Sequence, residues 1–60
     1  MQIAGFGQSA KRTADQLYVL WIHLGEDECR EQIEAHMESD GFSQDAIDAE
    51  IERLEVAGKF

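Results

Sequence analysis

The sequence predicts an all-α fold: a small three-helix bundle with a helix-turn-helix-like arrangement and a flexible N-terminal arm over residues 1–9. Three observations predict it. Apolar residues recur at spacings of three and four in three successive segments, which is the period of a helix. Glycines and N-capping residues separate these segments. The chain contains no proline, which suits helices because proline interrupts them. We expect one domain over residues 1–60.

The first helix is expected to start at Ser9 or at Thr13 and to end at Gly25. Thr13 and Gln16 fit a capping box, in which each side chain bonds the backbone amide of the other residue. The predicted core stripe of this helix consists of Ala10, Ala14, Leu17, Trp21 and Leu24. Within the arm before it, Ile3 and Phe6 are available to cover the core.

Residues 17–22 are apolar on every side of the predicted helix, so that helix must be buried on several sides. Two short partner helices leave part of it uncovered, and uncovered apolar surface on a protein marks an interface. We therefore predict a symmetric homodimer with Tyr18, Trp21 and Ile22 as its self-association residues. The same six residues have high β-propensity, so a buried strand is the alternative.

The second helix is expected over residues 27–39, with Cys29, Ile33 and Met37 facing the core. Gly41 occupies the position at which a helix ends in a left-handed residue, and Phe42 follows it, close to Met37. Phe42 is thus expected to pack against residues of both helices that the turn connects.

The third helix is expected to begin at Ser43, a good N-cap, and to end at Gly58. Phe42 and Ile47 are placed for a hydrophobic staple across its first turn. The predicted core stripe consists of Ile47, Ile51 and Leu54, closed by Val56 or Ala57.

Net charge is −8 and is concentrated in one half of the chain. Residues 26–60 contain twelve acidic and three basic residues, whereas residues 1–25 carry a net +1. Such a half repels a phosphate backbone. It either favours basic protein partners or simply keeps the chain soluble. The exposed acidic positions of the two later helices are the predicted partner-binding residues: Glu31, Glu34, Glu38, Asp45, Asp48 and Glu52.

No motif in the chain predicts catalysis, a metal or a cofactor. Cys29 and His36 are two turns apart, about 10 Å along a helix and too far for a nucleophile and its base. His23, Cys29 and His36 lack the close spacing of zinc ligands. Gly5 and Gly7 alone do not make a nucleotide-binding loop. The lone cysteine, the lack of a signal pattern and the shortness of the apolar run predict a cytoplasmic protein without a membrane span.

Two resemblances concern the second half. Ten residues resemble the three-helix repeat of the RecX recombination-regulator family: Ile33, Met37, Gly41, Phe42, Ile47, Ile51, Arg53, Leu54, Glu55 and Gly58. That family stacks several repeats and uses basic residues against a recombinase–DNA filament, whereas this chain is acidic. Residues 53–60 also look like the end of a winged-helix recognition helix. Both resemblances imply a helical unit built around a helix-turn-helix.

We therefore expect a small acidic intracellular regulator or inhibitor that binds a basic protein and is not an enzyme. One form would be charge mimicry of a nucleic acid, as in some phage-encoded inhibitors. The alternative is a minimal helix-turn-helix DNA-binding regulator that uses Lys11 and Arg12. A third possibility is that the chain is a structural or oligomerisation unit.

Overall fold

The computed structural model describes residues 9–60 and places them in three α-helices and one short 3₁₀ helix. The helices are α1 (Ala10–Trp21), α2 (Glu26–Ser39) and α3 (Gln44–Val56), and the 3₁₀ helix η2 (Ile22–Leu24) follows α1 directly. No strand occurs in the described part of the chain. The predicted all-α fold is confirmed, and the strand alternative for residues 17–22 is wrong. The predicted contribution of Ile3 and Phe6 lies outside the described residues.

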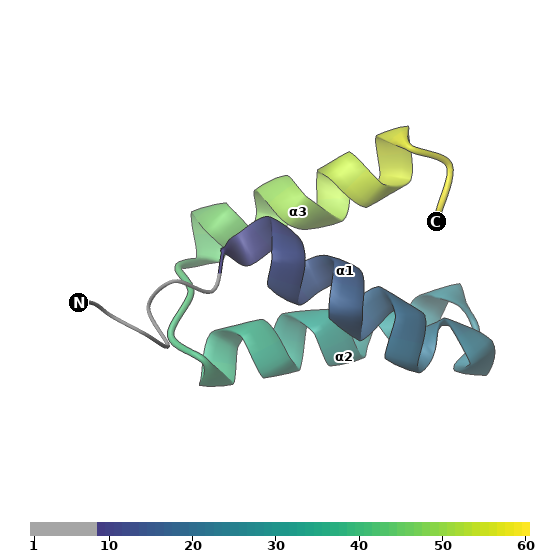
Figure 1. The fold of residues 1–60 in the computed structure, drawn as a ribbon, viewed down its shortest axis with the longest axis horizontal. Coiled ribbons are helices and arrows are strands. Elements are labelled where there is room, and N and C mark those ends of the chain that lie inside the picture. Colours follow the sequence, from purple (N-terminus) through teal and green to yellow (C-terminus); the bar gives the residue numbers. More distant parts are fainter. Residues whose placement is uncertain (1–8) are drawn as a thin grey trace.

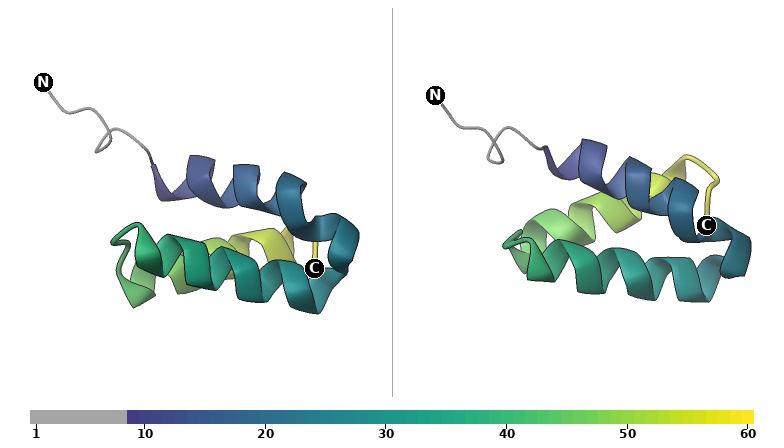
Figure 2. Two further views of the ribbon diagram at one scale, coloured as in Figure 1. Left: turned by 90° about the horizontal axis from the view of Figure 1, so that it is seen from below. Right: turned by 60° about the horizontal axis from the view of Figure 1, so that its bottom comes forward.

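The three helices form two layers. α2 and α3 run in opposite directions and make a hairpin, and α1 packs across it (Figures 1 and 2). α1 contacts both other helices, and α2 and α3 contact each other. One side of the hairpin is therefore covered by α1, and the other side is left to solvent.

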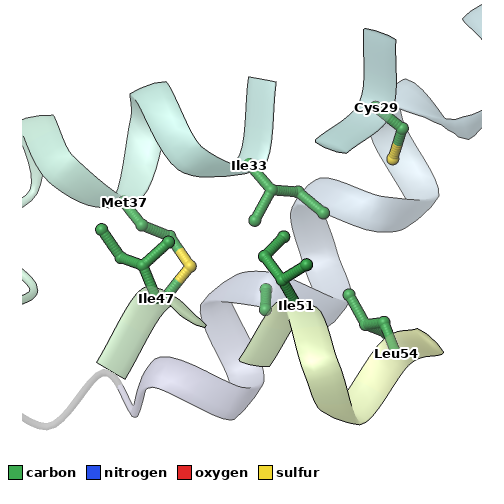
Figure 3. Packing of buried hydrophobic residues seen from close by; sticks show 7 residues of the cluster. Cys29, Ile33, Met37, Ile47, Ile51 and Leu54 are labelled. Carbon is green, nitrogen blue, oxygen red and sulfur yellow. The ribbon is translucent and has the colours of Figure 1, made fainter. Parts of the chain in front are cut away.

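The core is a single cluster at the centre of the three helices. α2 and α3 direct their apolar stripes toward one another, as Ile33, Met37 and Ile47 show in Figure 3. The buried apolar residues are Ala14, Cys29, Ile33, Met37, Ile47, Ile51 and Leu54. The spacings of four and three predicted these stripes on α2 and α3, because residues so spaced lie on one face of a helix.

α1 begins at Ser9, not at Thr13. The Ser9 hydroxyl accepts a hydrogen bond from the backbone N–H of Arg12 at 3.0 Å, which caps the helix. Thr13 lies inside α1, is buried and makes no capping bond. The predicted capping box is therefore wrong. The earlier start adds a helical turn that packs Ala10 against the core cluster.

The 3₁₀ helix η2 continues directly from α1, and the helical segment ends at Gly25. This glycine has φ 105° and ψ 159°, a backbone conformation that is open essentially only to glycine. A 3₁₀ helix turns more per residue than an α-helix, so η2 departs from the stripe of α1. Leu24 is consequently 51% exposed, and its predicted place in the core is wrong.

The turn between α2 and α3 is a Schellman motif, as the sequence predicted. The Phe42 N–H donates to the Met37 carbonyl at 3.1 Å and the Gly41 N–H to the Glu38 carbonyl at 3.0 Å. Gly41 has a φ of 95°. Phe42 is half-buried and packs against the core cluster that contains Met37 and Ile47. Ser43 then caps α3, accepting from the N–H of Ala46 at 3.2 Å.

α3 ends in a second Schellman motif around Gly58, whose φ is 81°. The Lys59 N–H donates to the Leu54 carbonyl at 2.9 Å. Val56 is 81% exposed and Ala57 is exposed too, so neither closes the core stripe as predicted. After the motif, Phe60 packs against the core cluster and meets the ring of Tyr18 edge-on, with ring centroids 5.7 Å apart.

Two ion pairs between helices show which edge of α3 adjoins α1 and which adjoins α2. Arg53 donates to Asp15 of α1 at 2.8 Å and also bonds Glu50 at 2.7 Å. On the other edge of α3, Glu55 accepts from Arg30 of α2 at 2.9 Å. The Arg30 guanidinium also lies over the Phe60 ring, 5.1 Å from its centroid.

Candidate functional site

The acidic residues of α2 lie on its outer side. Glu31, Glu34 and Glu38 recur at spacings of three and four, so they share one face of the helix. At 100° per residue this face lies opposite the stripe of Cys29 and Ile33 that enters the core. All three glutamates are exposed.

The acidic residues of α3 lie on the edge next to α2. Asp48 and Glu52 precede Glu55 by seven and three positions, so they share its edge of the helix. Asp45 precedes Asp48 by three positions and Glu52 by seven, so it lies on the same side as these two. Since Glu55 reaches Arg30 on α2, that edge adjoins α2. The opposite edge carries Glu50 and Arg53 and turns toward α1.

The two acidic rows therefore flank the exposed seam between α2 and α3. The helices are antiparallel, and the Arg30–Glu55 pair fixes their register. Counting from that pair at 1.5 Å per residue, Glu34 and Glu38 fall opposite the part of α3 that holds Glu52 and Asp48. The structure thus gathers the predicted partner-binding residues on one side of the hairpin, here called the acidic face: Glu31, Glu34, Glu38, Asp45, Asp48 and Glu52.

The basic residues of this half of the chain are used inside the fold. Arg30 and Arg53 pair with Glu55, Glu50 and Asp15, and Lys59 lies over the Tyr18 ring, 5.1 Å from its centroid.

Within residues 9–60, ten carboxylates of α2, α3 and their turn make no ion pair: Glu26, Asp27, Glu28, Glu31, Glu34, Glu38, Asp40, Asp45, Asp48 and Glu52. Two of these accept hydrogen bonds from glutamines, Glu28 from Gln32 and Asp48 from Gln44. The acidic face contains six of the ten, so its negative charge is not neutralised by the described part of the chain.

The predicted self-association residues are half-buried within their own chain. Tyr18 donates to the Lys59 carbonyl at 3.3 Å, and Trp21 stacks on His36 with ring centroids 5.9 Å apart. Ile22 packs against the core. The more exposed apolar side chains of residues 17–22 are Val19 and Leu20, which are 72% and 61% exposed. The structure thus locates the uncovered apolar surface beside the three predicted residues.

The candidate nucleophile Cys29 is buried, whereas the two histidines considered with it are exposed. Cys29 is fully buried, and burial raises the pKa of its thiol, which donates to the Tyr18 carbonyl at 3.8 Å. His36 is exposed on α2, and His23 is exposed on η2. A buried protonated thiol is a poor nucleophile because the thiolate is the reactive form. Among the described residues, no cluster of three or more His, Cys, Asp or Glu side chains is arranged to hold a metal.

Comparisons with protein-family models, with curated protein sequences and with solved structures found no match. Within residues 9–60, none of the helices combines the length and the apolar character that crossing a bilayer requires.

The residues behind the RecX resemblance have structural roles in this chain. Leu54 fills the core, and Arg53 and Glu55 on either side of it join α3 to α1 and to α2. Gly58 supplies the positive φ that ends α3. The Arg-Leu-Glu…Gly pattern is thus accounted for here by packing, pairing and capping.

Sequence reasoning missed two features of the surface. It did not find that Phe60 returns to Tyr18, nor that Arg30 and Arg53 are used in internal pairs. The spacing of Arg53 and Glu55 around a core leucine was the available signal, because residues that flank a buried position lie next to the neighbouring helices.

Proposed function

We propose that this protein is a small non-enzymatic binding module whose acidic face docks onto a basic surface of a partner protein, as a regulator or inhibitor does. The observation that carries the proposal is the acidic face itself. Six exposed carboxylates stand in two rows along one seam, without a cation from the described residues to neutralise them. Such a field attracts and orients basic proteins.

The form of the face also supports a docking role. Both rows stand on helices held by a shared core, Schellman turns and the Arg30–Glu55 pair, so the carboxylates have fixed spacing. The two rows of carboxylates on the packed helices resemble the rows of phosphate charges along a nucleic acid. An inhibitor that occupies a nucleic-acid-binding groove by charge mimicry is therefore one form that the proposal takes.

DNA binding by α3 is not favoured. A recognition helix in a helix-turn-helix protein presents donor side chains to base edges and cations to phosphates. The exposed residues of α3 include Asp45, Asp48 and Glu52, which phosphates repel. Lys11 pairs with Asp15, which leaves Arg12 as the exposed cation of α1 outside the ion pairs.

The experiment compares two variants of equal net charge. In the face variant, Glu31→Gln, Glu34→Gln and Glu38→Gln remove three charges from the acidic face. In the matched control, Glu26→Gln, Glu28→Gln and Asp40→Asn remove three charges that make no ion pair and lie outside the acidic face. Each protein is immobilised, exposed to native lysate, and analysed for bound proteins and nucleic acids, with circular dichroism as the check on folding.

We expect a basic protein to be retained by the parent and by the control but lost from the face variant. If the face variant and the control bind the partner equally, net charge and not the acidic face determines binding, which would contradict the proposal. Duplex DNA bound at low salt and released by added salt would instead support the helix-turn-helix alternative.

A further inference from the structure

We propose that Lys59 and Phe60, here called the strap, open and close over one end of the core while the three helices stay folded. The strap follows the Schellman motif at Gly58 and turns back from the end of α3 toward α1 (Figures 1 and 2). Its opening gives the buried thiol of Cys29 a route to solvent that does not require unfolding. This inference goes beyond the proposed function, because it concerns one end of the bundle and not the acidic face.

The ring of Phe60 joins all three helices at this end. It follows α3 in the chain and meets the ring of Tyr18 on α1, with the centroids 5.7 Å apart. The guanidinium of Arg30 on α2 lies over the same ring, 5.1 Å from its centroid. Phe60 also packs against the core cluster. In the closed position the strap therefore covers the end of the core that these helices share.

Cys29 lies among the residues that hold the strap. Its thiol donates to the Tyr18 carbonyl at 3.8 Å, and Arg30 is the next residue in the chain. The Lys59 N–H donates to the carbonyl of Leu54, and Figure 3 shows Cys29 and Leu54 at the same end of the core cluster. Cys29 is fully buried in the closed structure. We therefore expect release of Phe60 to expose this thiol.

The contacts that hold the strap are few and lie at the surface. The hydrogen bond from the Tyr18 hydroxyl to the Lys59 carbonyl is exposed, and so is the Lys59 side chain over the Tyr18 ring. Phe60 is half-buried and makes no backbone hydrogen bond within residues 9–60. The helices, in contrast, share the buried core. A segment held by few exposed contacts opens at a lower free energy than the whole fold.

The test measures the rate at which Cys29 reacts with a maleimide at increasing urea concentrations, while circular dichroism on the same samples reports global unfolding. Strap opening exposes little surface, so the reaction rate at low urea should change little with urea. At higher urea the rate should rise with the full slope of global unfolding. A rate that follows global unfolding at every urea concentration would overturn the proposal.

Three variants separate the strap from the rest of the fold. Phe60→Ala removes the ring that meets Tyr18 and Arg30 and should raise the low-urea rate by at least about tenfold. Tyr18→Phe removes only the hydroxyl that bonds the Lys59 carbonyl and should raise the rate by about fivefold, which keeps the test decisive if Phe60→Ala does not fold. Val56→Ala is the matched control: Val56 is 81% exposed at the end of α3, and this variant should react like the parent. Parent-like rates in the folded strap variants, or equal acceleration in Val56→Ala, would also overturn the proposal.

Discussion

Thr13 is a buried polar residue whose hydroxyl has no hydrogen-bond partner. Its side chain is 6% exposed and lies inside α1, one turn after the cap. A hydroxyl removed from water without a replacement bond carries a desolvation cost of about 1–3 kcal/mol. The methyl group of Thr13 therefore suits this buried position, whereas its hydroxyl does not.

Replacing this hydroxyl with a methyl group is expected to stabilise the fold. Thr13→Val keeps the branched shape and should raise the free energy of unfolding by about 1 kcal/mol, measured by urea titration. Thr13→Ser is the control, because it keeps the hydroxyl and loses the methyl, and it should be less stable than the parent. A Thr13→Val protein no more stable than the parent would mean that the hydroxyl is satisfied.

At the scale of the element, capping residues determine where each helix starts and stops. The Schellman turns at Gly41 and Gly58 and the cap at Ser43 could be predicted from sequence because each depends on a few neighbouring residues. The start of α1 could not be fixed in this way, since Ser9 and Thr13 both have capping side chains. The choice depends on which turn packs against the hairpin, and that is a property of the whole fold.

Gly41 provides a test of the turn between α2 and α3. A Cβ built at this position meets no atom within 4 Å, so a substitution there is opposed by the backbone conformation and not by a clash. Gly41→Ala should lower the free energy of unfolding by about 1–2 kcal/mol, because φ is 95°. Gly41→Asn should cost less, since asparagine tolerates the left-handed region. Equal stability of the alanine variant and the parent would contradict the Schellman assignment.

At the scale of the whole molecule, burial of the core stripes sets the relative rotations of the three helices, and the ion pairs between helices show which edges then meet. Arg53 with Asp15 joins α3 to α1, and Arg30 with Glu55 joins α3 to α2. Periodicity within one helix predicts which stripe is buried but not which neighbour each edge meets. For that reason the acidic residues could be predicted as exposed, whereas their gathering along one seam required the structure.

The Asp15–Arg53 pair predicts a specific dependence of stability on pH. The hydrogen bond from Arg53 is the main reason that the pKa of Asp15 is lowered, although partial desolvation works against it. A carboxylate with a lowered pKa stabilises the fold above its ordinary pKa of about 4 and loses this contribution as pH falls through the lowered value. Because both side chains are partly exposed, the contribution is below about 1 kcal/mol.

Urea titrations at several pH values measure this contribution. Asp15→Asn should be less stable than the parent at neutral pH, and the difference should shrink as the solution is acidified below pH about 4. Glu31→Gln is the control, because Glu31 is exposed and makes no ion pair among the described residues. A stability difference for Asp15→Asn that is the same at all pH values would contradict this assignment.

The central claim is that the acidic face, and not acidity in general, meets the partner. The most direct measurement is carbodiimide coupling of the protein to its retained basic partner, followed by mass spectrometry of the links between carboxylates and lysines. We expect the links to fall on the acidic face: Glu31, Glu34, Glu38, Asp45, Asp48 and Glu52. The unpaired carboxylates outside this face, Glu26, Glu28 and Asp40, should remain unlinked. Links spread evenly over both sets, or concentrated on Glu26, Glu28 and Asp40, would contradict this claim.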